Sequence, residues 1–159
     1  MEYISVEHQR VIGERFKIAS MIVFAFCVSV GVLAVIGLLV HPPEIVPGSD
    51  RFYSIVPVLV IVLAMGVIIL RRVWMAILVM RIATRVGAQA TINRLLQMSV
   101  VCATLSEMVA ITGLMFYLLT GNYRYSLLLC LVSLLLLLYT AFPRRGEWTR
   151  AVAAANARN

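Results

Sequence analysis

The chain has 159 residues, of which 62% are hydrophobic and only 13% are charged, and its formal net charge is +7. A water-soluble domain of this size is about half apolar and a quarter charged, so the composition excludes that class and indicates an integral membrane protein. The basic excess does not indicate nucleic-acid binding, because Lys and Arg collect in the cytoplasmic loops of membrane proteins.

Four apolar runs are candidates for membrane-spanning helices, since about 20 apolar residues cross about 30 Å of hydrocarbon. The predicted spans are 18–40, 54–70, 98–119 and 126–142. A proline-containing segment follows the first run, and Pro143 ends the fourth. Residues 73–80 are interpreted as a continuation of the second helix along the headgroups, with Trp74 at the interface. The last nine residues, "AVAAANARN", are expected to form a frayed helical end.

The distribution of basic residues predicts the orientation. Twelve lie in the two terminal segments and in 71–97, whereas only Arg51 and Arg124 lie on the other side. This asymmetry predicts that both termini are cytoplasmic and that 71–97 is a basic cytoplasmic loop. The predicted fold is therefore one all-α membrane domain, 1–159, with four transmembrane helices in an antiparallel bundle. The predicted location is the cell membrane, as a multi-pass protein.

The 71–97 segment has no acidic residue, so it is a candidate for binding anionic lipid headgroups. Each arginine near such a surface contributes about 1 kcal/mol. The predicted headgroup contacts are Arg71, Arg72, Arg81 and Arg85. The positive-inside rule alone also explains why arginines occur in a cytoplasmic loop, and both interpretations stay open.

Glu107 is the only acidic residue in any of the long apolar runs. At 1.5 Å per residue it lies about 14 Å from the inner edge of its span, near the midplane of the bilayer. A carboxylate there costs roughly 3 kcal/mol, and such residues usually bind protons or cations or belong to a polar pair. Low dielectric disfavours the charged form and no Lys or Arg lies in a predicted span, which favours a protonated carboxyl.

Small and polar residues surround Glu107 in its sequence. Thr104 and Ser106 are close to it, although they point in other directions. Residues at spacings of three or four form a stripe that would let helices approach closely in lipid. The stripe consists of Ser99, Ala103, Ser106, Ala110 and Gly113. The first span also has small residues, at Ala25, Ser29, Gly31, Ala34 and Gly37. A purely structural role for Glu107 remains the alternative.

No cofactor or metal site is expected. The three cysteines lie in separate apolar runs, and neither histidine has a Cys or His nearby, so metal-ligand spacing is absent. Catalysis is not expected either, because the chain offers too few convergent polar groups.

The stretch "RLLQMSVVCATLSEMVAITGLMFYLL", 94–119, resembles the carboxylate-bearing helix of the rotor-ring c subunit of rotary ATP synthases, called subunit K in vacuolar-type relatives. The matching features are Arg94 at the start, Ala103 before the acidic residue, Glu107 itself and "AITGL" at 110–114. The resemblance covers 94–119 only, and the remaining sequence diverges. It implies that Glu107 carries a proton or a sodium ion, and Met108 after the carboxylate favours the proton.

The sequence supports two possible functions. The first is a proton-carrying membrane protein that uses Glu107. The second is a structural or assembly subunit of a larger membrane complex with no transport activity of its own. The expected partners are the lipid bilayer, anionic lipids included, and either further copies of the chain or a membrane complex.

Overall fold

The computed structural model describes residues 6–40, 52–77 and 83–156, and every regular element in them is helical. The elements are α1 (Val6–Leu39), α2 (Phe52–Ile77), α3 (Ala83–Thr120), α4 (Tyr123–Leu136), the π-helical turn η3 (Leu137–Ala141) and α5 (Arg145–Asn156). Four helical segments are long and apolar enough to cross a membrane, namely Gln9–Leu39, Tyr53–Ile77, Gly87–Thr120 and Tyr123–Ala155. The predictions of an all-α chain and of four such segments are confirmed.

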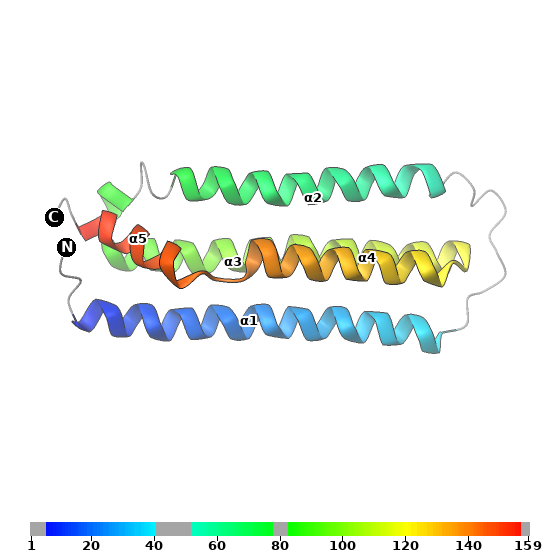
Figure 1. Ribbon diagram of the computed structural model, residues 1–159, viewed down its shortest axis with the longest axis horizontal. Coiled ribbons are helices and arrows are strands. Elements are labelled where there is room, and N and C mark those ends of the chain that lie inside the picture. The colour runs from blue at the N-terminus through cyan, green and yellow to red at the C-terminus, as the bar shows by residue number, and fades with distance from the viewer. Residues whose placement is uncertain (1–5, 41–51, 78–82, 157–159) are drawn as a thin grey trace.

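The long helices lie side by side, and successive helices run in opposite directions (Figure 1). In this view α1 and α2 form the two sides, while α3 and α4 lie between them. The helix α3 is central, because it contacts α1, α2, α4 and α5. The start of α1, the end of α2 and all of α5 lie at the same end of the molecule.

The helices are longer than the predicted spans. Residues 71–77 still belong to α2, and 83–97 already belong to α3, so most of the predicted basic loop 71–97 is helical. The predicted spans were ended where the apolar run met charged residues. A charged side chain does not end a helix, however, because the backbone hydrogen bonds of the helix continue past it.

Two glycines allow the backbone to turn at the ends of α3. Gly87 has φ +79° and separates the first turn of α3 from the rest of the helix. Gly121, with φ +69°, ends α3, and its N–H donates to the carbonyl oxygen of Tyr117 at 2.7 Å. Asn122 then caps α4 by accepting a hydrogen bond from the N–H of Tyr125. Positive φ is accessible to glycine without steric cost, so the antiparallel turn needs only two residues.

The predicted stripe of small residues on α3 is buried along its whole length. At Gly113 the helix α4 comes so close that a Cβ atom there would lie 2.8 Å from Cβ of Leu129. Further along, the hydroxyl of Ser133 on α4 donates to the carbonyl oxygen of Ser106 at 2.7 Å. Small side chains thus bring the two backbones together, as the stripe predicted.

The C-terminal helix is packed against the other helices, so the expectation of a frayed end was wrong for the residues described. Trp148, Ala151, Val152 and Ala155 are each at most 1% exposed. Their spacing of three and four residues puts them on one face of α5. The Trp148 ring also meets Phe16 of α1 edge to face, with centroids 6.0 Å apart.

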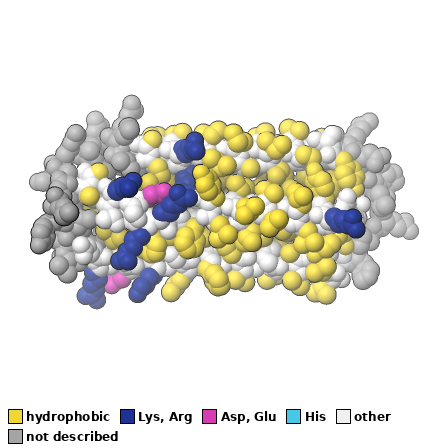
Figure 2. All heavy atoms as spheres, in the orientation of Figure 1, with side chains coloured by type: hydrophobic (Ala, Val, Ile, Leu, Met, Phe, Trp, Pro, Cys, Tyr) yellow, Lys and Arg dark blue, Asp and Glu magenta, His cyan; other side chains and the backbone are white. Residues whose placement is uncertain are grey.

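The outer surface of the long helices is apolar over most of its length. Figure 2 shows hydrophobic side chains covering the middle of the visible face, with Lys and Arg gathered mainly towards one end. On α2, six large apolar residues are each more than half exposed. They are Ile55, Val58, Ile61, Val62, Met65 and Ile69. Such a continuous surface is unfavourable in water and is typical of contact with lipid or another protein.

The close approach at Gly113 leads to the first prediction. Gly113→Ala should lower the free energy of unfolding by about 1–3 kcal/mol, because the new methyl group overlaps Leu129. Thermal unfolding of the detergent-purified variant measures this. Gly31→Ala is the matched control, since no atom lies within 4 Å of a Cβ there. Equal unfolding temperatures for the two variants would contradict the close contact.

Candidate functional site

Glu107 lies on the side of α3 that faces α1. Its Oε1 atom accepts a hydrogen bond from the hydroxyl of Ser29 on α1, and both side chains are partly buried. Thr120 lies thirteen positions after Glu107, so the carboxyl is about 20 Å along the axis from the Thr120 end of α3. The carboxyl thus lies at the interface of two long helices, away from the ends of both.

The site opens outwards. Ala25, Phe26, Ser29 and Glu107 line a shallow groove of about 230 Å³ between α1 and α3. The small side chains of Ala25 and Ser29 leave this space, because they lie one helical turn apart on the same face of α1. A carboxyl at the base of an open groove is shielded on one side by the helices and reachable from the other.

The residues expected to support Glu107 have other roles. Ala103, Ser106, Ala110 and Gly113 are buried, and the Ser106 hydroxyl donates to the carbonyl oxygen of Cys102 at 2.8 Å. Thr104 is exposed, and its hydroxyl donates to the carbonyl oxygen of Val100. The hydrogen-bond partner comes from a different helix.

Ser29 is the residue that sequence reasoning missed as a partner. It was assigned to close packing because it belongs to a run of small residues in the first span. The available signal was its hydroxyl, since it is one of only two hydroxyl-bearing residues in 18–40. A periodic pattern within one helix does not reveal which residues of another helix stand opposite, so this pairing required the three-dimensional structure.

The groove has no positive partner for the carboxylate among the described residues. The ion pairs among the described residues lie elsewhere in the molecule. They join Arg10 to Glu14, and both Arg71 and Arg144 to Glu147. Glu107 takes part in none of them. Its one side-chain hydrogen bond among the described residues is to a neutral hydroxyl, which can donate to an ionised carboxylate and can also accept from a protonated carboxyl. The contact therefore suits both protonation states.

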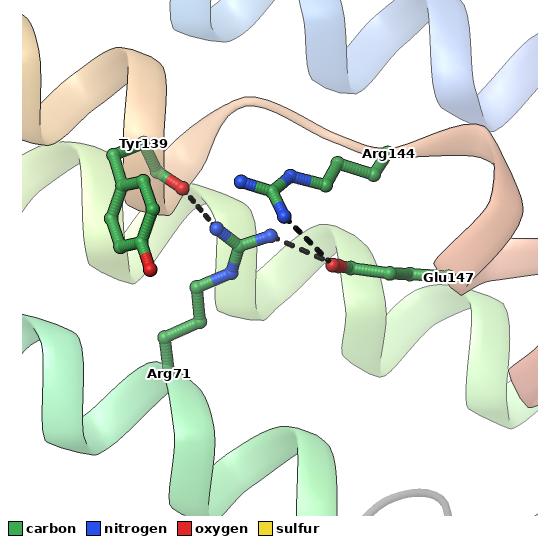
Figure 3. Close-up of polar contacts among 4 residues, drawn as sticks. All are labelled: Arg71, Tyr139, Arg144 and Glu147. Atoms are coloured by element: carbon green, nitrogen blue, oxygen red, sulfur yellow. Dashed lines mark hydrogen bonds and ion pairs between the residues drawn. The ribbon is translucent and has the colours of Figure 1, made fainter.

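Arg71 occupies a different place from the one predicted. It was expected at lipid headgroups, but it is only 8% exposed. Its guanidinium donates to the carbonyl oxygen of Tyr139 and lies 2.9 Å from Oε2 of Glu147 (Figure 3). The guanidinium is thus positioned between the end of η3 and the beginning of α5.

Pro143 explains why an arginine is needed at this position. In an α-helix the carbonyl oxygen of Tyr139 would accept from the N–H four residues later, but that residue is Pro143, which has none. The Arg71 guanidinium supplies the missing donor. Its charge also suits the carboxyl end of one helix, and the Glu147 charge suits the first turn of the next.

Of the other predicted headgroup contacts, Arg72 is exposed on α2. Arg81 and the side chain of Arg85 lie outside the described residues. The described cysteines, Cys27, Cys102 and Cys130, are free thiols, and no group of metal-binding side chains occurs among the residues described.

Comparisons of the chain with protein-family models, with curated proteins and with solved structures found no match. We therefore infer the function from the chemistry of the two polar sites, at Glu107 and at Arg71.

The Arg71 contacts give the second prediction. Arg71→Met should lower the free energy of unfolding by about 1–3 kcal/mol, because the Tyr139 carbonyl and the Glu147 carboxylate both lose a partner. Amide hydrogen exchange in α5 should become faster than in the unmodified protein. Arg72→Met, at the exposed neighbouring position, is the control and should leave exchange in α5 unchanged. Unaltered exchange in the Arg71 variant would show that α5 is held without this pair.

Proposed function

We propose that this chain is a multi-pass protein of the cell membrane in which Glu107 reversibly binds a proton within the bilayer. The observation that carries the proposal is the pairing of Glu107 with Ser29 in a groove on the apolar body of the molecule. A neutral hydroxyl stabilises a carboxylate less than a cation would, and it can also accept a hydrogen bond from a protonated carboxyl. Such a site can take up and release a proton without losing its partner, which is the behaviour expected of a carrier.

The similarity of 94–119 to subunit c supports the same chemistry for Glu107. We propose that this chain uses it on a different scaffold, since the hydroxyl partner comes from α1 and not from α2, the helix immediately before the carboxylate-bearing one. Met108, which follows the carboxylate, is exposed and offers no oxygen ligand for sodium. The transported species proposed is therefore the proton.

The proposed orientation places both termini in the cytoplasm. Nine of the ten basic side chains described lie on the half of the molecule nearer the start of α1 and the end of α2, and only Arg124 lies at the opposite end. The nine are Arg10, Arg15, Lys17, Arg71, Arg72, Arg94, Arg144, Arg145 and Arg150. The positive-inside rule assigns the richer end to the cytoplasm.

The alternative function is an assembly subunit of a larger membrane complex. The exposed apolar faces of α1 and α2 support it, because they fit a protein neighbour as well as they fit lipid. Under this alternative Glu107 is a structural partner of Ser29, and the isolated protein moves no protons.

Proton movement gives the third prediction. In proteoliposomes with an internal pH-sensitive dye and an imposed potential, Glu107→Gln should reduce proton flux to that of empty liposomes. The glutamine keeps the shape and a hydrogen bond to Ser29 but does not titrate. Ser29→Ala should reduce flux about tenfold, the equivalent of one hydrogen bond to a charged group.

Thr104→Val is the matched control, because its hydroxyl bonds only to its own helix, and its flux should be that of the unmodified protein. A carbodiimide, which reacts with protonated carboxyls, should label Glu107 in the unmodified protein and find no target there in the Gln variant. Unchanged flux in the Gln variant would refute proton carriage by Glu107. Absence of flux in the unmodified protein would favour the assembly function.

The orientation gives the fourth prediction. A fluorescent protein that folds only in the cytoplasm should be active when fused after Asn159. Alkaline phosphatase, which needs an oxidising compartment, should be active when the chain is cut and fused at Asn122, between α3 and α4. The reverse pattern of activities would overturn the assignment.

A further inference from the structure

A second hollow lies at the basic end of the molecule, between α2 and the joint of η3 with α5. Its volume is about 310 Å³. Arg71, Arg72, Arg144 and Glu147 form its polar wall. Figure 3 shows Arg71 and Arg144 approaching Glu147 from different elements, so residues far apart in sequence build this wall together.

The polar wall has more positive than negative charge. One Glu147 oxygen is taken by Arg71 at 2.9 Å, and the other is 3.6 Å from Arg144. Arg72 makes no ion pair with any described residue. Two guanidinium groups thus share one carboxylate, and a third, that of Arg72, has no described carboxylate partner. Arg72 and Arg144 therefore have hydrogen-bond donors left for an anion.

The rest of the hollow is apolar. Ile68 and Met75 of α2 and Tyr139 of η3 line it. Arg144 also lies over the Tyr139 ring at 5.6 Å, which holds its guanidinium beside the apolar wall. On α2 the exposed apolar residues Met65 and Ile69 extend this apolar lining away from the basic end. A positively charged wall thus lies next to a long, exposed apolar surface.

We propose that this hollow binds one anionic phospholipid, with its phosphate between Arg72 and Arg144 and an acyl chain along α2. Guanidinium groups match phosphate oxygens in geometry and charge, and they are more weakly hydrated than ammonium groups. The excess positive charge selects a headgroup with a net negative charge over a zwitterionic one. Arg71 does not contact the lipid, because it is committed to Tyr139 and Glu147.

This inference rests on the membrane location proposed above and is independent of proton binding at Glu107. The Glu107→Gln variant should therefore retain the lipid as the unmodified protein does. Failure of proton flux and failure of lipid binding are distinguishable in this way.

Native mass spectrometry tests the proposal. Protein purified in a neutral detergent is mixed with equal amounts of phosphatidylglycerol and phosphatidylcholine that have the same acyl chains. We expect one phosphatidylglycerol to be retained in preference. Arg72→Gln and Arg144→Gln should each weaken this preference about fivefold, from the loss of one arginine near an anionic headgroup.

Arg150→Gln is the matched control, because Arg150 is an exposed arginine of α5 that does not line the hollow, and its variant should keep the preference. Inorganic phosphate in millimolar excess should not displace the lipid, since it lacks the acyl chain. Circular dichroism checks that each variant is helical. If Arg144→Gln does not fold, Arg72→Gln decides, because its side chain has no described ion pair to lose.

Three results would overturn the proposal. One is the same preference for phosphatidylglycerol in the Arg72 variant as in the unmodified protein. Another is an equal loss of preference in the Arg150 control, which would show attraction to the basic end in general. The third is displacement by inorganic phosphate, which would indicate a bare anion site.

Discussion

The close approach of α3 and α4 is the constraint on which the other contacts depend. With no side chain at Gly113, the two backbones come near enough for the Ser133 hydroxyl to reach the carbonyl oxygen of Ser106. This spacing sets the path of α4 and therefore the place where Pro143 ends it. The joint with α5 then lies against α2, within reach of Arg71. A packing requirement at one end of α3 thus positions a charged contact at the other end of the molecule.

Arg71 and Glu107 have partners of opposite kinds. Arg71 meets the Glu147 carboxylate and the Tyr139 carbonyl oxygen, which has no backbone N–H donor four residues later, so its guanidinium has partners for both its charge and its donors. Glu107 accepts a hydrogen bond from the Ser29 hydroxyl, and it takes part in no ion pair with a described residue. One group thus has a charged partner and the other a neutral one. This difference in partners is why we assign function to Glu107 and a structural role to Arg71.

Hydropathy and helical spacing were sufficient to predict the all-α class, the four long apolar segments and the buried stripe on α3. They were not sufficient to predict contacts between residues of different helices. Ser29 was not recognised as the partner of Glu107, and Arg71 was assigned to headgroups, because a sequence pattern does not show what stands opposite a residue. The packed face of α5 was detectable in principle from the spacing of Trp148, Ala151 and Val152. It was overlooked because alanine-rich ends resemble frayed ones.

The partners of Arg71 have a consequence for the order in which the molecule is completed. Tyr139 and Glu147 are synthesised 68 and 76 residues after Arg71. During translation α2 therefore carries an uncompensated guanidinium until Glu147 has been synthesised. If the chain spans a bilayer, as we propose, such a helix stays shallow, with its arginine drawn to water, until α5 has been made. The final position of α2 is then reached only after α5 has been made, so a product that stops before Glu147 would be distinguishable from one that includes it by how deeply this helix lies in the membrane.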